Sequence, residues 1–137
     1  MSATKDKVTG EEPAPWGARH RRRPEDAIQR AVFQHLRTRA APGVFAFHPA
    51  NGGYRKPVEA AIMEGLGVVA GVPDVFAVHN GRCFALELKA EGERATDKQL
   101  ETIAALREAG AFTAIAEGLD CALAVLKAWG LLRGRAS

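Results

Sequence analysis

The sequence contains little cysteine and no long apolar run. Its two cysteines, Cys83 and Cys121, match neither a metal-binding motif nor a disulfide framework, which favours a reducing compartment. Both lie in apolar stretches, so we expect them to be small core residues. No segment reaches the roughly 18 consecutive apolar residues of a membrane span, and polar residues rather than a hydrophobic signal region follow Met1. These absences predict a soluble cytoplasmic protein without a membrane segment.

Most of the chain also has no excess of positive or negative charge. The formal net charge is +3, and residues 1–23 account for all of it, with six Lys and Arg against three acids. Residues 1–22 mix charge, proline and glycine without apolar periodicity, which predicts a flexible basic N-terminal arm. The hydrophobic content of 47% suits one compact domain, which we place at residues 23–137.

Apolar periodicity and turn residues predict helices and strands in the order α, β, α, β, β, α, β, α. The expected helices cover residues 24–40, 57–66, 97–109 and 120–129, and the expected strands cover residues 44–48, 73–79, 82–90 and 111–117. The third helix begins with a capping-box pattern at Thr96 and Gln99. The short tail after Gly130 is expected to fray.

Asn80-Gly81 lies between two apolar runs and is the strongest short-range signal in the chain for a two-residue β-hairpin. Counting the pairs outward from this turn places Asp74 directly opposite Glu87. Because side chains alternate along a strand, the two acids share one face of the sheet with Lys89. The hairpin therefore gathers three charges at its open end.

Apart from these charges, both faces of the hairpin are apolar. One face carries Phe76, Val78, Cys83 and Ala85, and the other carries Val75, Ala77, Phe84, Leu86 and Leu88. A strand pair that is buried on both faces requires helices above and below it. We therefore predict an α/β fold with a central sheet between helices.

Two opposed carboxylates repel each other, and beside a core this repulsion requires a positive charge. Lys89 alone could neutralise the pair, or a divalent cation with oxygen ligands, Mg²⁺ or Mn²⁺, could do so. Geometry leaves both alternatives open. Lys89 lies about 7 Å beyond Glu87 along the strand, where an ammonium group could stabilise a phosphoryl transition state. The charges are therefore the parts of a phosphodiesterase.

Several of these residues resemble a known nuclease pattern. Pro73-Asp74 followed by Glu87-Leu88-Lys89 looks like the signature of the PD-(D/E)xK superfamily, and a wider set resembles its VRR-Nuc (virus-type replication-repair nuclease) family. That set is Glu25 with Gln29, Asn51-Gly52-Gly53 with Arg55, GVVAGVPD, ELK, and Thr96 with Gln99. The resemblance covers about residues 24–117. It implies a restriction-endonuclease-like αβββαβ core, here with an extra helix between the first two strands and a C-terminal helix.

The resemblance implies a role for each residue of the central motif. Asp74 and Glu87 would be metal ligands, with the backbone carbonyl of Leu88 joining them. Lys89 would be the catalytic lysine. The metal would be Mg²⁺ or Mn²⁺.

Two further positions have a structural explanation beside the functional one. Glu25 stands in the first turn of a helix, where acids favour the helix dipole, but the resemblance implies that it reaches the metal directly or through water. Gln99 stands where a capping box requires Gln, but the resemblance implies a place at the catalytic centre. His48, at a strand end, is expected to be a partly buried structural residue, because no second histidine stands at ligand spacing.

Two basic segments predict contacts with nucleic acid. The arm could merely aid solubility and the glycine loop could be only a turn, but their charge favours capture of a phosphate backbone. The residues predicted to contact DNA are Arg19, Arg21, Arg22 and Arg23 in the arm and Asn51, Tyr54, Arg55 and Lys56 in the loop.

These observations predict a Mg²⁺- or Mn²⁺-dependent DNA endonuclease. The resemblance implies a small homodimer that cuts branched DNA, such as four-way junctions, in replication, recombination or repair, and it leaves a phage origin open. Two alternatives remain. One is a non-catalytic nucleic-acid-binding module, against which the complete set of Asp74, Glu87 and Lys89 argues. The other is a restriction-type enzyme, although 137 residues leave little room for an element that reads bases.

Overall fold

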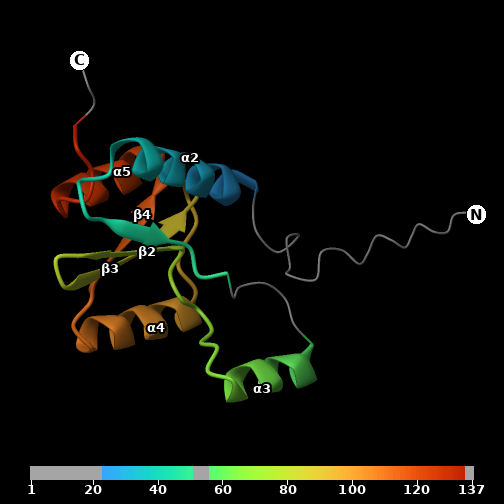
Figure 1. Ribbon diagram of the computed structural model, residues 1–137. Helices are drawn as coiled ribbons and strands as arrows, with labels where there is room; N and C mark the ends of the chain where they lie inside the picture. Colours follow the sequence, from blue (N-terminus) through green and yellow to red (C-terminus); the bar gives the residue numbers. More distant parts are fainter. Residues whose placement is uncertain (1–22, 51–55, 135–137) are drawn as a thin grey trace, which may run out of the picture.

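The computed structural model describes residues 23–50 and 56–134, and its elements follow the predicted order (Figure 1). They are α2 (Arg23–Arg39), β1 (Phe45–Phe47), α3 (Pro57–Gly65), β2 (Val75–His79), β3 (Arg82–Lys89), α4 (Asp97–Glu108), β4 (Phe112–Glu117) and α5 (Gly118–Ala128). The basic arm and part of the glycine loop lie outside the described residues. The predictions for Arg19, Arg21, Arg22, Asn51, Tyr54 and Arg55 therefore stay predictions.

The strands form one mixed sheet in the order β1-β2-β3-β4. β1, β2 and β3 are antiparallel neighbours, whereas β4 runs parallel to β3. A parallel pair needs a crossover connection, which α4 supplies. Helices α2 and α5 cover one face of the sheet, and α4 lies on the other (Figure 1). The predicted α/β architecture, with a mixed central sheet between helices, is confirmed.

The predicted hairpin and its register are confirmed. Asn80 has φ 51° and Gly81 has φ 76°, so both turn residues adopt the left-handed conformation that a two-residue hairpin turn requires. The pairs run from His79↔Arg82 to Val75↔Leu86. The ladder therefore ends one residue short of Asp74.

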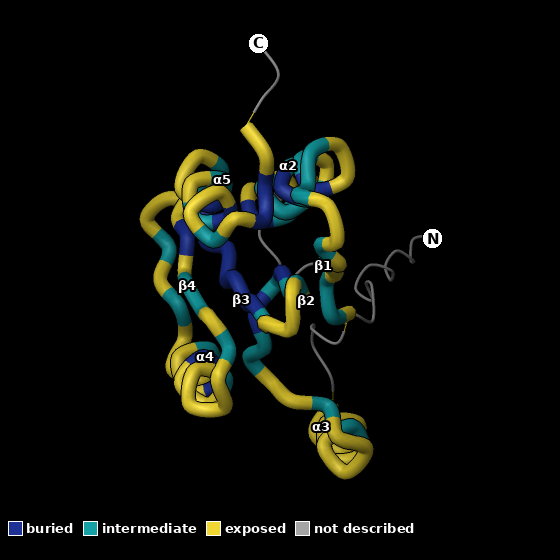
Figure 2. Tube along the Cα trace, turned by 60° about the vertical axis from the view of Figure 1, so that its left-hand side comes forward, coloured by how far each residue is buried: buried dark blue, intermediate teal, exposed yellow. Residues whose placement is uncertain are grey.

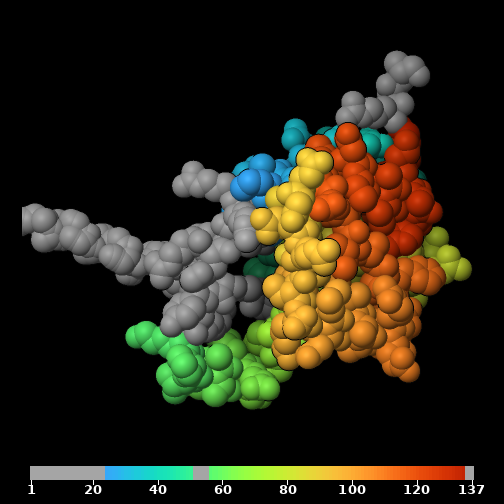
Figure 3. Space-filling view, turned by 180° about the vertical axis from the view of Figure 1, so that it is seen from behind, coloured from blue at the N-terminus to red at the C-terminus, as the bar shows by residue number. Residues whose placement is uncertain are grey.

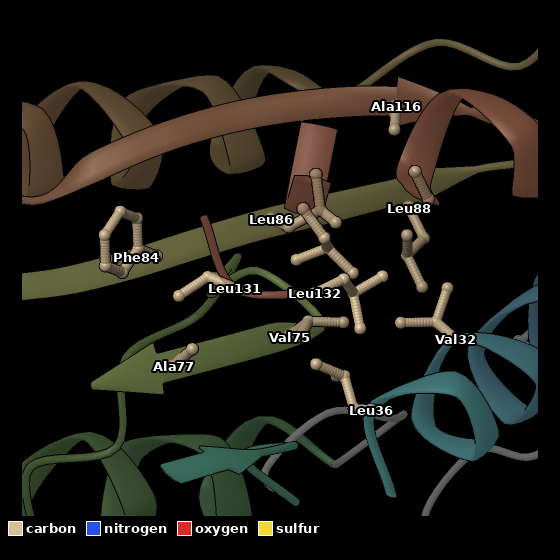
Figure 4. Close-up of a cluster of buried hydrophobic side chains, with 12 residues drawn as sticks. Val32, Leu36, Val75, Ala77, Phe84, Leu86, Leu88, Ala116, Leu131 and Leu132 are labelled. Atoms are coloured by element: carbon tan, nitrogen blue, oxygen red, sulfur yellow. The ribbon is translucent and has the colours of Figure 1, made fainter. Parts of the chain in front are cut away.

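The core lies between the sheet and helices α2 and α5. One face of the hairpin, which was predicted to be entirely apolar, packs against side chains of α2 and α5 (Figure 4). Its buried members include Val75, Ala77, Phe84, Leu86 and Leu88 from the hairpin, Val32 and Leu36 from α2, and Ala122 and Leu126 from α5. β3 is buried along most of its length and forms the centre of the molecule (Figure 2). The site at its end therefore rests on a strand whose last six residues are all buried.

The opposite face of the sheet is covered only in part. α4 packs on the β4 side of the sheet with Thr102 and Ile103 buried. Beyond α4, Phe45 of β1 is 66% exposed and Val78 of β2 is 44% exposed. The prediction that both faces of the hairpin are buried is therefore wrong for β2, because α4 is too narrow to reach the first two strands.

Helix α3 stands apart from the rest of the fold. Pro57 begins it, as predicted, and the helix buries none of its residues. Its apolar stripe of Val58 and Ile62, continued by Leu66 after the last turn, faces solvent. Figure 2 shows this helix, which lies between β1 and β2 in the sequence, as exposed and set apart from the sheet. The helical spacing predicted a helix correctly but could not identify what its apolar face contacts.

Two other expectations are wrong. The segment after Gly130 does not fray at its start, because Leu131 and Leu132 are buried and join the core. Ala41 N–H donates to the carbonyl of Leu131 at 2.8 Å, which ties this segment to the end of α2. Cys121 is exposed rather than in the core, since the face of α5 that packs inward is the one that carries Ala122.

In the part of the chain that the structure describes, no helix has both the length and the apolar composition needed to cross a membrane.

Candidate metal centre

The charges predicted from the hairpin lie at the end of β3. Lys89 is 6% exposed, and its Nζ lies 3.7 Å from Oε2 of Glu87, which is 1% exposed. The same Nζ lies 3.7 Å from Oε2 of Glu25, in the first turn of α2. Figure 3 shows the start of α2 against the segment that follows β3. The structure therefore brings Glu25, Glu87 and Lys89 together, as the resemblance implied.

Asp74 lies directly before β2 and is held by two hydrogen bonds. Its Oδ2 accepts from the backbone N–H of Leu88 at 3.0 Å. Its own carbonyl oxygen lies 2.7 Å from Nδ1 of His48. Leu88 is the neighbour of both Glu87 and Lys89, so the carboxylate of Asp74 lies at the same end of β3 as the other charges. Hairpin counting thus predicted the correct end of the sheet for Asp74, whereas the ladder stops at Val75↔Leu86 and does not pair Asp74 with Glu87.

The loop that leads into Asp74 is fastened to α4. Thr102 Oγ1 donates to the carbonyl of Ala70 at 2.7 Å. Gly71 has φ 77°, and a Cβ at this position would lie 2.7 Å from the carbonyl oxygen of Lys98. Only glycine satisfies both the left-handed backbone and this close approach. The glycine of the sequence GVPD therefore allows the loop to pack against the first turn of α4.

Gln99 lies in the first turn of α4 and takes part in the cap of this helix. Its Oε1 accepts from the N–H of Thr96 at 2.9 Å, and its own N–H donates to Oγ1 of Thr96 at 3.1 Å. These bonds form the predicted capping box. The structural explanation thus accounts for Gln99, and its catalytic role stays a prediction.

A fourth acid, Glu117, was not predicted. The parallel register pairs Glu117 at the end of β4 with Lys89. Its Oε2 accepts from the N–H of Gly92 at 2.8 Å, which holds the turn that follows β3. Counting from a hairpin turn cannot find this residue, because no short turn joins β3 to β4. The acid at the end of the strand FTAIAE was the available signal.

The formal charges of the four residues at the end of β3 do not balance. Glu25, Asp74 and Glu87 contribute three negative charges, and Lys89 contributes one positive charge. Oε2 of Glu25 is buried and accepts no hydrogen bond from the described part of the chain, although the ammonium of Lys89 lies 3.7 Å away and is shared with Glu87. A buried group of this kind is expensive unless a positive charge or a donor reaches it. The excess negative charge fits a cation.

The donor atoms suit a hard divalent ion, because carboxylate and carbonyl oxygens are the ligands of Mg²⁺ and Mn²⁺. Among the described residues, no group of three or more His, Cys, Asp or Glu converges closely enough to hold a metal. An ion here would therefore depend on fewer side chains, completed by backbone oxygen and water. Mg²⁺ commonly keeps several waters in such sites.

Comparison with solved structures supports the fold implied by the resemblance. A structure described as a VRR_NUC domain protein aligns with a TM-score of 0.60 at 23% identity, over 83% of this chain and 99% of that one. A second, described as a VRR_NUC domain, gives 0.54 at 16% identity, over 76% and 95%. The chain thus has the fold of these VRR_NUC structures.

A third match is to Hjc of Archaeoglobus fulgidus, a Holliday junction resolvase from an archaeal hyperthermophile. Its TM-score is 0.42 at 19% identity, over 66% of this chain and 64% of that one, which is too low to support a conclusion. No family model matches the chain, and no curated protein matches its sequence.

Proposed function

We propose that this protein is a metal-dependent DNA endonuclease that hydrolyses phosphodiester bonds. The observation that carries the proposal is the buried Lys89 between Glu25 and Glu87, with the carboxylate of Asp74 bound one residue away. The fold of the VRR_NUC domain structures supports the same conclusion. In this role the protein acts inside the cell.

Asp74 and Glu87 would hold the metal, with the carbonyl of Leu88 and with Glu25 directly or through water. The ion would be Mg²⁺ or Mn²⁺, and when bound it would supply Lewis-acid polarisation of the phosphate. The chain itself prepares the ligands. The N–H of Leu88 orients the carboxylate of Asp74, and the ammonium of Lys89 lies between the carboxylates of Glu25 and Glu87.

Lys89 has a second task in the proposed reaction. Water attacks the scissile phosphorus in line and loses a proton to solvent, while the P–O bond to the leaving oxygen breaks and that oxygen takes up a proton. Negative charge grows on the phosphoryl oxygens in the transition state, where a preorganised ammonium stabilises it. The same ammonium can orient the attacking water. Burial of Lys89 at 6% exposure makes this charge effective, because little solvent screens it.

The proposed substrate is branched DNA, such as a four-way junction. Support for DNA as the substrate comes from basic residues of the chain. Lys56, at the start of α3, is exposed, and Arg23 begins the helix that carries Glu25. Together with the basic arm and the rest of the glycine loop, they would bind phosphates on either side of the scissile bond. Such contacts position DNA without reading its sequence.

A cleavage assay tests the reaction. The protein is incubated with linear, flap and four-way-junction DNA in Mg²⁺, in Mn²⁺ and in chelator, beside Asp74→Asn and Lys89→Met. We expect cutting only with metal, a loss of at least about 100-fold in either variant, and preference for the junction. DNA binding should survive Lys89→Met.

Other outcomes would replace the proposal. Cutting that persists in chelator or in both variants would overturn the assignment of the site. Binding without cutting under all conditions would favour the non-catalytic module, and cuts at a fixed sequence in linear duplex would favour a restriction-type enzyme.

We also propose that the active form is a homodimer, whose two sites could cut both strands of a junction. Two apolar faces support it: the sheet face of Phe45, Phe47 and Val78, and the α3 face of Val58, Ile62 and Leu66. These six side chains are each at least 38% exposed, and burial of two such faces per copy would contribute to the roughly 800 Å² that each partner buries in a standard interface. A nine-residue helix that buries nothing is also unstable alone. In the proposed dimer, the α3 face of each copy covers the sheet face of the other.

Sedimentation equilibrium tests this assembly at micromolar concentration. We expect twice the mass of one chain for the wild type and a single-chain mass for Ile62→Glu. Leu100→Glu is the matched control, because Leu100 is an exposed apolar residue on α4, outside both faces. A monomeric wild type, or dissociation by Leu100→Glu alone, would reject the proposed interface.

A further inference from the structure

His48 makes a close side-chain contact with the backbone of a proposed metal ligand. It follows β1 directly and is half-buried. Its Nδ1 lies 2.7 Å from the carbonyl oxygen of Asp74, 26 residues away in sequence. A carbonyl oxygen only accepts, so Nδ1 must carry the proton. The ring therefore acts as a fixed donor to the backbone of Asp74.

This bond acts at the point where both ladders of β2 end. The β1–β2 ladder ends at Phe47↔Phe76, and the β2–β3 ladder ends at Val75↔Leu86. Asp74 is the residue just before Val75, and its carbonyl shares a peptide plane with the N–H of Val75. The direction of this carbonyl sets the backbone torsion ψ of Asp74, and this torsion helps to aim the chain that carries the carboxylate. His48 adds a side-chain hydrogen bond to that carbonyl, beyond the last paired residue.

The hydrogen bonds on Asp74 act from opposite sides. The N–H of Leu88 holds the side chain through Oδ2, and the ring of His48 holds the main chain through the carbonyl oxygen. With both ends of the residue fixed, the carboxylate stays in one place relative to Glu87. Without the bond from His48, the carbonyl of Asp74 would lose a donor that orients the main chain, while the bond from the N–H of Leu88 to Oδ2 would remain.

We propose that His48 is a positioning residue for the metal site, which holds Asp74 in the geometry that binds the ion. The inference rests on the proposed function, because it assigns Asp74 as a ligand. His48 itself binds no metal in this proposal, since its Nδ1 is committed to the carbonyl. Partners that orient metal ligands in this way typically contribute about 10- to 100-fold to metal affinity.

The chain contains a matched control in His79. Its Nε2 lies 3.2 Å from the carbonyl of Pro42, so it is also a half-exposed histidine bonded to a distant backbone carbonyl. It lies beside the turn of the hairpin, at the end remote from Asp74. Loss of this bond should affect stability but not the metal site.

The experiment compares His48→Leu, His48→Asn and His79→Leu. Mn²⁺ binding is measured by calorimetry without DNA, stability by urea denaturation, and cleavage by kcat and KM. We expect His48→Leu to weaken Mn²⁺ binding by about 10- to 100-fold and to lower kcat with little change in KM for DNA. His48→Asn, whose amide nitrogen replaces Nδ1 as a donor, should restore binding to within a few fold.

His79→Leu should bind Mn²⁺ like the wild type even if it is less stable. If His48→Leu does not fold, His48→Gln replaces it in the comparison. The amide of Gln lies one methylene further from the backbone than that of Asn, so it should hold the carbonyl of Asp74 less well. We therefore expect His48→Gln to bind Mn²⁺ more weakly than His48→Asn does. Wild-type Mn²⁺ affinity in the His48→Leu or His48→Gln protein would overturn this inference alone. An equal loss in His79→Leu would also overturn it. A wild type that neither binds Mn²⁺ nor cuts DNA would overturn the proposed function as well.

Discussion

Lys89 separates two buried carboxylates, and its removal should therefore affect stability as well as activity. Lys89→Met leaves Glu25 and Glu87 without the ammonium between them, and loss of one partner from a buried ion pair costs about 3–5 kcal/mol. We expect a lower urea midpoint in chelator and a larger gain on adding Mn²⁺ than in the wild type, because the ion then replaces the missing positive charge. Urea denaturation with and without Mn²⁺ measures both effects.

Lys98→Met provides the control for this prediction. Lys98 pairs with Glu101 at 3.4 Å, but both side chains are at least 60% exposed. Exposed pairs contribute about 0–1 kcal/mol, so this variant should unfold almost like the wild type. Equal losses in the two variants would mean that burial does not strengthen the interactions of Lys89.

Two properties require glycine at position 71: the positive φ and the close approach to α4. Comparison with Gly67 separates their effects on stability. Both have positive φ, but a Cβ at Gly71 would collide with the backbone of α4, whereas a Cβ at Gly67 would meet nothing within 4 Å. Gly67→Ala should cost about 1 kcal/mol through backbone strain alone. Gly71→Ala should cost clearly more and also weaken Mn²⁺ binding, since the loop before Asp74 must move. Identical losses in stability would show that the close approach to Lys98 is unimportant.

At the scale of elements, the hairpin turn determines which side chains reach the site. One glycine inserted between Asn80 and Gly81 can shift the pairing of β3 by one residue, which would send Glu87 and Lys89 to the other face. We therefore expect the insertion to abolish Mn²⁺ binding and to destabilise the fold. Asn80→Gly, which keeps two residues able to adopt positive φ, should retain binding. Near-normal Mn²⁺ affinity in the insertion variant would contradict this account.

The difference between local and distant contacts explains which features the sequence could predict. The hairpin register, the capping box of Thr96 and Gln99 and the helix opened by Pro57 are local, since neighbouring residues decide them. The place of Glu117 depends on a parallel pairing between distant strands, and burial of Leu131 depends on how α2 and α5 approach each other. Local patterns do not contain such distances. The exposed α3 face was missed for the same reason.

For the whole molecule, the basic arm should determine how binding depends on salt. Residues 1–22 carry five of the Lys and Arg residues, and each phosphate contact adds nearly one unit to the slope of log K against log salt. We expect deletion of these residues to weaken junction binding and to flatten this slope, while kcat at saturating DNA changes little. Fluorescence anisotropy over a series of salt concentrations measures the slope.

Deletion of residues 1–10 is the control, because it removes Lys5 and Lys7 but leaves the arginine cluster. It should have the smaller effect on the slope. If the longer deletion lowered kcat as strongly as it weakened binding, the arm would belong to the catalytic centre rather than to DNA capture.

Most of the charged residues of the site come from one short stretch of sequence, and this affects the order in which the folding chain can assemble the site. Asp74, Glu87 and Lys89 all belong to one hairpin with a two-residue turn, and hairpins form in about 1–10 μs. The pairing of β3 with β4 and the docking of α2 must close longer loops, and such distant contacts form more slowly. The nascent chain therefore brings its two opposed acids together with their ammonium already beside them. Glu25 joins a partly neutralised cluster only when α2 docks.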